Sequence, residues 1–350
     1  MQRRRLLLAL PWFVHAVPSS ALPSPSIAFP RDHGAHPDLR TEWWYITGRA
    51  QGGGREFGFQ VTFFRTRVDA TQGMRSRFAA KQLVFAHAAI TDVQGRKLWH
   101  DQRIAREGFD IAAAATADAH VRLRGWSLER TGDERWHANI EAGDFTLALR
   151  FTPTQPVLLQ GSAGLSRKGP QAVQSSYYYS VPHLATDGTL TLQGRAIAVT
   201  GQAWLDHEWS EELLDRDAVG WDWIGMNLDD GSALTAFRLR RADGSTLWDG
   251  GSFRSAQGSL RVWNPGEIDF SPQRRWTSPA SQATYPVDWK VRTPVGSYTV
   301  RAVIDDQELD SRASTGAIYW EGLSRLHDGS GRVVGHGYLE MTGYAQRLRI

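Results

Sequence analysis

The sequence predicts an all-β protein of the sandwich or barrel type, built from two similar halves. Three observations support this prediction. Apolar residues alternate with polar or small ones over many short segments, and glycine-containing turns separate these segments. No long stretch keeps a convincing helical period. A nine-residue motif near the middle of the 350-residue chain also returns close to its C-terminus.

The N-terminus has the pattern of a secretory signal peptide. Three arginines at 3–5 precede the apolar run 6–14, and small residues at 19–21 offer a cleavage site. We expect residues 1–21 to be removed during Sec or Tat export to the periplasm or the exterior. The proline-rich stretch 22–37 is typical of an extended arm.

The composition of the remaining chain excludes some classes of function. Without residues 1–21 the chain has 37 Lys and Arg against 37 Asp and Glu. Its formal net charge is therefore zero, and no surface for nucleic acid is indicated. There is no second long apolar segment, so we expect a soluble protein, at most peripheral to a membrane. There is no cysteine, so the core must stabilise the protein without disulfides.

The first half contains the clearest period-two segments. Residues 57–64 and 145–151 each form a strand with one apolar face. Shorter strand-like runs cover 83–91, 126–131, 136–141 and 189–193. Turn signals stand at 52–54, 94–95, 131–133 and 187–188. The best helical candidate is 210–219, which has an acidic first turn and is only about three turns long.

The second half repeats this texture and carries the internal match. Strands are expected at 233–240, 246–253, 287–292, 297–304, 318–326 and 333–343. The sequence V-T-G-Q-A-W-L-D-H at 199–207 matches V-V-G-H-G-Y-L-E-M at 333–341, and the Trp-rich segment 43–45 resembles 221–223. These matches favour a duplication, with a first domain at 38–210 and a second at 211–350.

Barrel closure would pair the first and last strands of each half. In the first half this places 42–45 beside 204–209. Glu42 and Asp206 can then approach each other, although the sequence gives no register.

Four sequence blocks resemble the family of carotenoid 1,2-hydratase (hydroxyneurosporene synthase) and AttH-like proteins. They are H-P-D-L-R-T-E-W-W-Y-I-T-G at 36–48, S-Y-Y-Y-S at 176–180, G-Q-A-W-L-D-H-E-W at 201–209 and G-W-D-W-I-G-M-N-L-D-D-G at 220–231. The resemblance implies two consecutive lipocalin-like antiparallel β-barrel domains with few short helices, and an apolar ligand. Some members of this family add water to isoprenoid double bonds. Others are exported proteins encoded beside ABC-type permeases, which makes an ABC-type transporter a candidate partner.

Hydration of an alkene requires a proton donor, a shielded carbocation and a positioned water. It requires no metal and no organic cofactor, and we expect neither. Asp206, flanked by Trp204 and Trp209, is the candidate acid, because burial and a nearby carboxylate such as Glu42 raise the pKa of an aspartate. His207 can hold a water or orient the acid.

Asp222 is a second candidate acid, because it lies between Trp221 and Trp223. A turn or an interdomain salt bridge is the alternative role for this residue.

Structural roles are also open for the other three residues. Side chains of Asp206 and His207 point to opposite faces of a regular strand, so one cavity cannot receive both without a bulge. Either residue can instead bond to loop backbone. Glu42 can be a rim residue paired with Arg40 or Arg65.

Aromatic residues of the same blocks are the candidate ligand-binding residues. They can line an apolar cavity, and their faces can stabilise a developing cation by about 2 kcal/mol when desolvated. They are Trp43, Trp44, Tyr45, Tyr177, Tyr178, Tyr179, Trp204, Trp209, Trp221 and Trp223. The chain has 15 tryptophans, about three times the usual share, which fits either an aromatic-lined cavity or an aromatic-rich core.

Other chemistries lack a signature. Asp206, His207 and Glu208 are ligand types, but three consecutive strand residues cannot converge on one metal ion. His33 and His36 lack a clear third partner. There is no nucleophile elbow and no dinucleotide fingerprint.

Two functions remain. One is a cofactor-free hydratase, a hydro-lyase acting on an isoprenoid or lipid. The other is a non-catalytic binder or carrier of a hydrophobic molecule in the cell envelope. Export disfavours a literal carotenoid substrate, because carotenoid hydratases work with pigment biosynthesis at the cytoplasmic membrane.

Overall fold

The computed structural model describes residues 21–24 and 26–348, so nearly all of the expected signal peptide lies outside the described residues. The described chain is all-β, as predicted. Its helical content is two single turns of 3-10 helix, η1 (Arg31–His33) and η2 (Asp69–Thr71). None of the described helices is long and apolar enough to cross a membrane.

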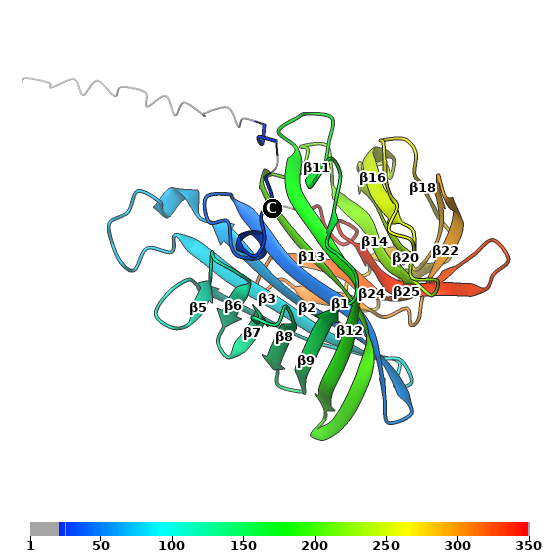
Figure 1. Ribbon diagram of the computed structural model, residues 1–350, viewed down its shortest axis with the longest axis horizontal. Helices are drawn as coiled ribbons and strands as arrows, with labels where there is room; N and C mark the ends of the chain where they lie inside the picture. Colours follow the sequence, from blue (N-terminus) through cyan, green and yellow to red (C-terminus); the bar gives the residue numbers. More distant parts are fainter. Residues whose placement is uncertain (1–20, 25, 349–350) are drawn as a thin grey trace, which may run out of the picture.

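The first half of the chain forms a thirteen-stranded antiparallel sheet that curls into a nearly closed barrel (Figure 1). The strand order is β4-β3-β2-β1-β13-β12-β9-β8-β7-β6-β5, with β10 and β11 pairing with β12. Strands β5 and β6 return against β3 and β4. The strands are β1 (Thr41–Gly52), β2 (Arg55–Arg67), β3 (Gln82–Asp92), β4 (Lys97–Arg106), β5 (Ala112–Ala114), β6 (His120–Leu123), β7 (Trp126–Arg130), β8 (Trp136–Glu141), β9 (Phe145–Pro153), β10 (Leu158–Leu159), β11 (Leu165–Arg167), β12 (Ser175–Leu192) and β13 (Arg195–Glu212).

The second half forms a ten-stranded antiparallel sheet in the order β17-β16-β15-β14-β25-β24-β22-β21-β18, with β23 pairing with β24. A separate hairpin joins β19 and β20. The strands are β14 (Gly220–Leu228), β15 (Ala233–Arg240), β16 (Thr246–Arg254), β17 (Leu260–Trp263), β18 (Asp269–Pro272), β19 (Arg275–Thr277), β20 (Thr284–Pro286), β21 (Asp288–Thr293), β22 (Gly296–Ala302), β23 (Glu308–Ser311), β24 (Ala317–His327) and β25 (Val333–Met341).

The expected pairing of first and last strands is confirmed in both halves. Strand β1 pairs with β13, and β14 pairs with β25. The two copies of the repeated motif therefore occupy equivalent strands. Leu205 and Leu339 point into the cores of their own barrels, whereas Asp206 and Glu340 point out of them toward a common cavity.

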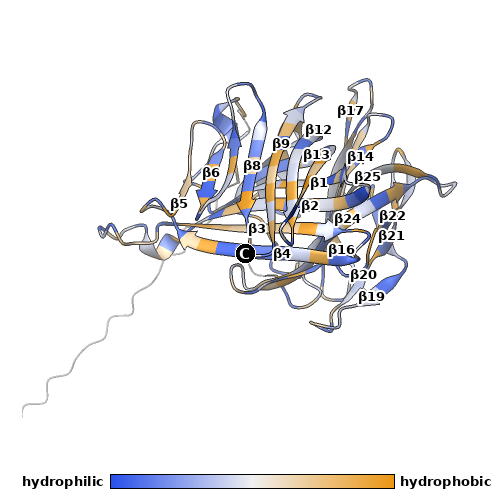
Figure 2. Cartoon of the chain, turned by 90° about the horizontal axis from the view of Figure 1, so that it is seen from below, coloured by the Kyte–Doolittle hydropathy of each residue, from blue (hydrophilic) through white to orange (hydrophobic). Residues whose placement is uncertain are grey.

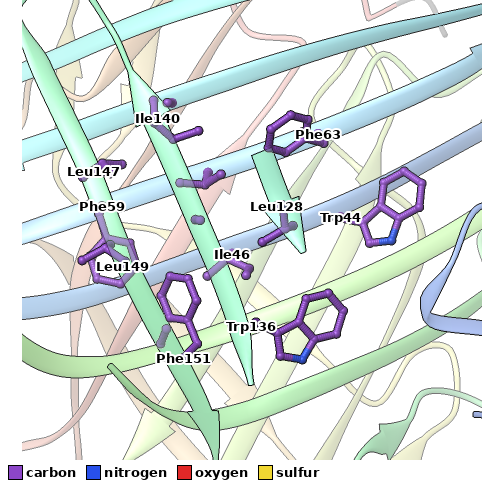
Figure 3. Close-up of a cluster of buried hydrophobic side chains, with 14 of the residues drawn as sticks. Trp44, Ile46, Phe59, Phe63, Leu128, Trp136, Ile140, Leu147, Leu149 and Phe151 are labelled. Atoms are coloured by element: carbon purple, nitrogen blue, oxygen red, sulfur yellow. The ribbon is translucent and has the colours of Figure 1, made fainter. Parts of the chain in front are cut away.

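The interior of the first barrel is filled with apolar side chains (Figure 3). Trp44, Phe59 and Phe63 come from β1 and β2, and Trp136 and Phe151 meet them from β8 and β9. Apolar and polar residues alternate along the strands, because successive side chains point to opposite faces (Figure 2). The outward faces are thus the surfaces on which a site can form.

The helix expected at 210–219 is absent. Strand β13 continues to Glu212, because Ser210 pairs with Thr41 of β1 and donates its hydroxyl to the Ser175 carbonyl of β12, 3.0 Å away. The chain then turns at Asp215, whose carboxylate accepts the amide of residue 217.

The arm is not extended throughout, because η1 gives it one helical turn. This turn is closed by the carboxylate of Asp32, which accepts the amide of Ala28 at 2.6 Å. Trp44 anchors the arm to the first barrel by donating its indole N–H to the His33 carbonyl at 2.9 Å.

Candidate functional site

A cavity of about 400 Å³ lies between the two barrels. One wall is the outer face of β1, β2, β3, β12 and β13, and the other is the outer face of β14, β15, β24 and β25. Aromatic side chains from both barrels line it: Trp43, Tyr45, Phe64, Phe85, Tyr178, Trp221, Trp223, Phe237 and Tyr319. The site thus requires both halves of the chain.

Asp206 of β13 lies in this wall and is buried. Tyr178 donates its hydroxyl to Oδ2 at 2.8 Å, and Trp204 donates its indole N–H to Oδ1 at 2.7 Å. The Ser180 hydroxyl also donates to Oδ1. Among the described residues, no cation forms an ion pair with Asp206.

Burial raises the pKa of Asp206 to about 7, against the opposing effect of its three hydrogen-bond donors. A substantial fraction of this carboxyl is therefore protonated at neutral pH. An aspartic acid of this kind can donate a proton to a ligand in the cavity.

Besides Glu42, which also borders the cavity, three further carboxyl residues line it, and the sequence did not single these three out as site residues. Glu208 forms an ion pair with Lys168, with Nζ 3.0 Å from Oε1. Glu321 and Glu340 are directly opposed on β24 and β25. Burial raises the pKa of Glu340 to about 8 and that of Glu321 well above its usual range.

For two of these three carboxyl residues, Glu208 and Glu340, the sequence contained a pattern that could have identified them as cavity residues. Glu208 lies two residues from Asp206, on the same face of the strand. Glu340 is the repeat counterpart of Asp206. Glu321 stands in no motif, and only the pairing of β24 with β25 brings it to the cavity.

Glu42 and Asp206 do not meet, so the expectation that they approach is wrong. The register pairs Glu42 with Trp209 and Asp206 with Tyr45, which places the two carboxyls on opposite faces. His207 follows Glu42 into the core side of the sheet, with Nε2 3.0 Å from Oε1.

Glu42 is the centre of a buried polar network under the arm. Its carboxylate accepts Arg65 Nε at 2.8 Å and the His36 amide at 2.9 Å, and His36 Nδ1 lies 2.7 Å away. Burial alone would raise the pKa of Glu42, but the hydrogen bonds to His207 and His36 outweigh it and hold that pKa below its usual range. Of the two partners considered for Glu42, Arg65 is the one observed, and Glu42 is buried rather than at a rim. Glu42 and Arg65 border the cavity, but the hydrogen bonds of their side chains are made within this network, which stabilises the fold.

His36 does find partners, contrary to expectation. Ligand atoms of His36, Glu42 and His207 lie within 4.8 Å of one another, close enough to consider a metal ion. The guanidinium of Arg65 already donates a hydrogen bond to the Glu42 carboxylate, and Asp32 Oδ1 lies 3.1 Å from His36 Nε2. The donors are thus engaged with one another, and we interpret the group as a hydrogen-bonded network.

Asp222 points into the second barrel, away from the cavity. Its carboxylate accepts Arg238 Nε at 2.7 Å, Arg240 Nη1 at 3.0 Å and the Tyr344 hydroxyl at 2.9 Å. This is a salt-bridge role, within the second half rather than between the halves. The candidate role of Asp222 as an acid is therefore not supported by its position.

The aromatic candidates divide between the two faces. Those lining the cavity are Trp43, Tyr45, Tyr178, Trp221 and Trp223, with Trp204 packed edge-on against Trp223 at 6.4 Å between centroids. Those in the core of the first barrel are Trp44, Tyr179 and Trp209, and the hydroxyl of Tyr177 donates to the Pro23 carbonyl of the arm. Gly225 makes room for the Trp223 ring, which a Cβ at that position would strike.

Two antiparallel β-barrel domains, with an aromatic cavity between them, define a lipocalin-like two-barrel protein. The family model described as AttH-like matches residues 20–344. The chain therefore belongs to the AttH-like family.

Solved structures support this assignment. A putative AttH from Nitrosomonas europaea is 49% identical, with a TM-score of 0.86, over 93% of this chain and 99% of that chain. Kievitone hydratase from Nectria haematococca is 16% identical, with a TM-score of 0.69, over 87% of this chain and 89% of that one. CghA in complex with Sch210972 is 14% identical, with a TM-score of 0.56, over 88% of each chain. The last two show a shared fold alone. No curated protein sequence matches the chain.

Proposed function

We propose that this protein binds an isoprenoid or similar lipid between its barrels and adds water to a C=C bond by acid catalysis. The observation that carries the proposal is Asp206, a buried carboxyl in the cavity wall whose pKa is raised to about 7 by burial. Such a group keeps a proton available at neutral pH, and an alkene is a poor base that requires a proton donor at close range.

The reaction balances without a cofactor. The Asp206 carboxyl transfers its proton to one alkene carbon, which leaves a carbocation on the other. Water adds through its oxygen, and the resulting oxonium loses a proton, which restores the carboxyl. The rings of Tyr45, Tyr178 and Trp223 line the cavity and present aromatic surface to the cation.

The fold comparison adds support of a general kind. Kievitone hydratase carries the name of an enzyme that adds water, and it shares this two-barrel fold. Fold likeness at that identity does not transfer an activity, so the proposal depends on Asp206 and its surroundings.

A carrier of a hydrophobic molecule is the second candidate. The observation that favours it is the saturation of Asp206, since donors already engage both carboxyl oxygens. The expected export to the cell envelope and an ABC-type transporter partner fit this alternative and remain proposals.

The test is incubation of the protein, beginning at residue 22, with acyclic carotenoids and bacterial envelope lipids in water labelled with ¹⁸O. Mass analysis of the extracted ligands should show incorporated solvent oxygen. Asp206→Asn should abolish incorporation, whereas Glu134→Gln, an exposed change outside the cavity, should not. Tight binding without incorporation would favour the carrier, and no binding of any lipid would count against both candidates.

A further inference from the structure

We propose that the cavity selects amphiphilic ligands with a cationic head, the chemical class of long-chain amines, and that Glu321 and Glu340 bind that head. The inference rests on the proposed function, because it names the charge of a ligand for the same cavity.

The first observation is that the cavity wall has more carboxyl groups than cationic partners for them. Five carboxyl residues line the cavity; Glu42 pairs with Arg65, and Glu208 pairs with Lys168. Arg65 also borders the cavity, but its guanidinium is bonded to Glu42, Gln82 and two carbonyls on the core side. The exposed Arg40 stands at the edge. Asp206, Glu321 and Glu340 thus have no ion-pair partner in the described part of the chain.

The second observation is a buried acceptor without a partner. Glu321 is 3% exposed and lines the cavity. Gln60 donates to its Oε2 at 2.7 Å. Oε1 lies beside the Tyr45 hydroxyl, but it has no well-formed hydrogen bond to this hydroxyl or to any other described residue. A buried unpaired acceptor costs about 1–3 kcal/mol of stability, so a ligand that donates a hydrogen bond to Oε1 would bind more tightly.

The third observation is the aromatic surface around these carboxyls. Trp223 stands directly opposite Glu340 on β14, and Tyr319 is two residues from Glu321 on the same face of β24. Lys168 shows that this wall accepts an ammonium, because its Nζ lies 4.6 Å from the Tyr178 centroid and 4.4 Å from the Phe237 centroid. Carboxylates combined with ring faces form the environment in which an alkylammonium is stabilised.

Binding of a cation in this cavity is expected to be coupled to the protonation of Glu321 and Glu340. Burial raises the pKa of both Glu321 and Glu340, so the pair is largely uncharged at neutral pH. A cation placed beside them favours the ionised form, so binding should release a proton. The titratable groups around the pair are Tyr45, Tyr178, Tyr319, Asp206, Glu208, Lys168 and His87 of the cavity lining, together with Tyr338 of β25.

The test compares decylamine with decanol, which have the same chain and differ in the charge of the head. Isothermal titration calorimetry at pH 7 should give decylamine at least tenfold tighter binding, equivalent to about 1.4 kcal/mol. Repeating the decylamine titration in phosphate and Tris buffers should reveal a released proton, and decanol should release none.

Variants assign the effect to the pair. Glu321→Gln and Glu340→Gln should reduce the preference for the amine at least tenfold while leaving decanol binding unchanged, and Glu134→Gln should change neither. In the unaltered protein the preference should also increase from pH 6 to pH 9, because the carboxyls ionise while an aliphatic amine, with a pKa near 10.4, stays charged.

The outcomes separate the two proposals. Equal binding of amine and alcohol, or an amine preference that survives both substitutions, would overturn this inference and leave the proposed function standing. No binding of either probe, together with no lipid bound in the labelling experiment, would overturn both.

Discussion

Substitution of Glu42 by glutamine tests whether this residue is structural rather than catalytic. The change keeps the shape of the side chain and removes its charge. Glu42 is fully buried, and Arg65, whose side chain is 1% exposed, is 2.8 Å from it. Loss of one partner of a buried pair typically costs about 3–5 kcal/mol. Because Arg65 keeps Gln82 and two carbonyls as acceptors, we expect the lower end, about 3 kcal/mol.

The pH dependence supplies a second readout. The pKa of Glu42 is lower in the folded protein than its ordinary value of 4.5, so the folded state binds fewer protons than the unfolded state. Its contribution to stability is therefore complete above about pH 4.5 and is lost as the pH falls. Glu42→Gln should remove this part of the acid sensitivity.

Guanidinium unfolding, followed by tryptophan fluorescence between pH 3 and pH 7, measures both effects. Glu211→Gln is the matched control, because Glu211 forms a partly exposed pair with Arg67 that should contribute about 0–1 kcal/mol. A loss below 1 kcal/mol for Glu42→Gln, with an unchanged acid limb, would refute the structural role.

Three further substitutions test other parts of the molecule. Asp222→Asn leaves Arg238 and Arg240 without their counter-charge and should lower the free energy of unfolding by about 3–5 kcal/mol in guanidinium titrations, and a neutral result would contradict the salt-bridge role. The pKa of Glu340 is about 8 in the folded protein and lower in the unfolded chain, so the unaltered protein loses stability as the pH rises between these two values. Glu340→Gln should remove this loss, so that the free energy of unfolding falls less between pH 5 and pH 8 than in the unaltered protein, by at least about 1.4 kcal/mol. Unfolding at the two pH values measures this, and parallel pH profiles would refute it. Leu205→Ala should cost about 2–5 kcal/mol by opening a void in the first barrel, measured by thermal unfolding, and a cost below 1 kcal/mol would show that the position is not core.

Much of the fold follows from local patterns. Period-two alternation at 57–64 and 145–151 determines which residues share a face, and glycine turns mark where strands end. The repeat at 199–207 and 333–341 predicted the closing strands of both halves, which the pairings of β1 with β13 and β14 with β25 confirm. The helix predicted at 210–219 does not form, because the strand pairing of its first residues with β1 and β12 overrides a weak local preference for helix.

The candidate site was predicted less completely. Alternation separated Asp206 from His207, but it could not say which face meets the core and which meets the other barrel. The strand register determined the position of Glu42, because backbone pairing across about 165 residues of chain places it opposite Trp209 and not opposite Asp206.

The sequence by itself determined the all-β fold and the repeated closing strand, and it singled out Asp206 as a candidate, because alternation and motif repeats are readable in residue order. Only the tertiary structure placed the cavity between the barrels and brought Glu321 and Glu340 into it. The physical reason is that a strand's two faces are equivalent until other strands pack on them. Burial between two barrels, which no local pattern encodes, is what raises the pKa values of these carboxyls.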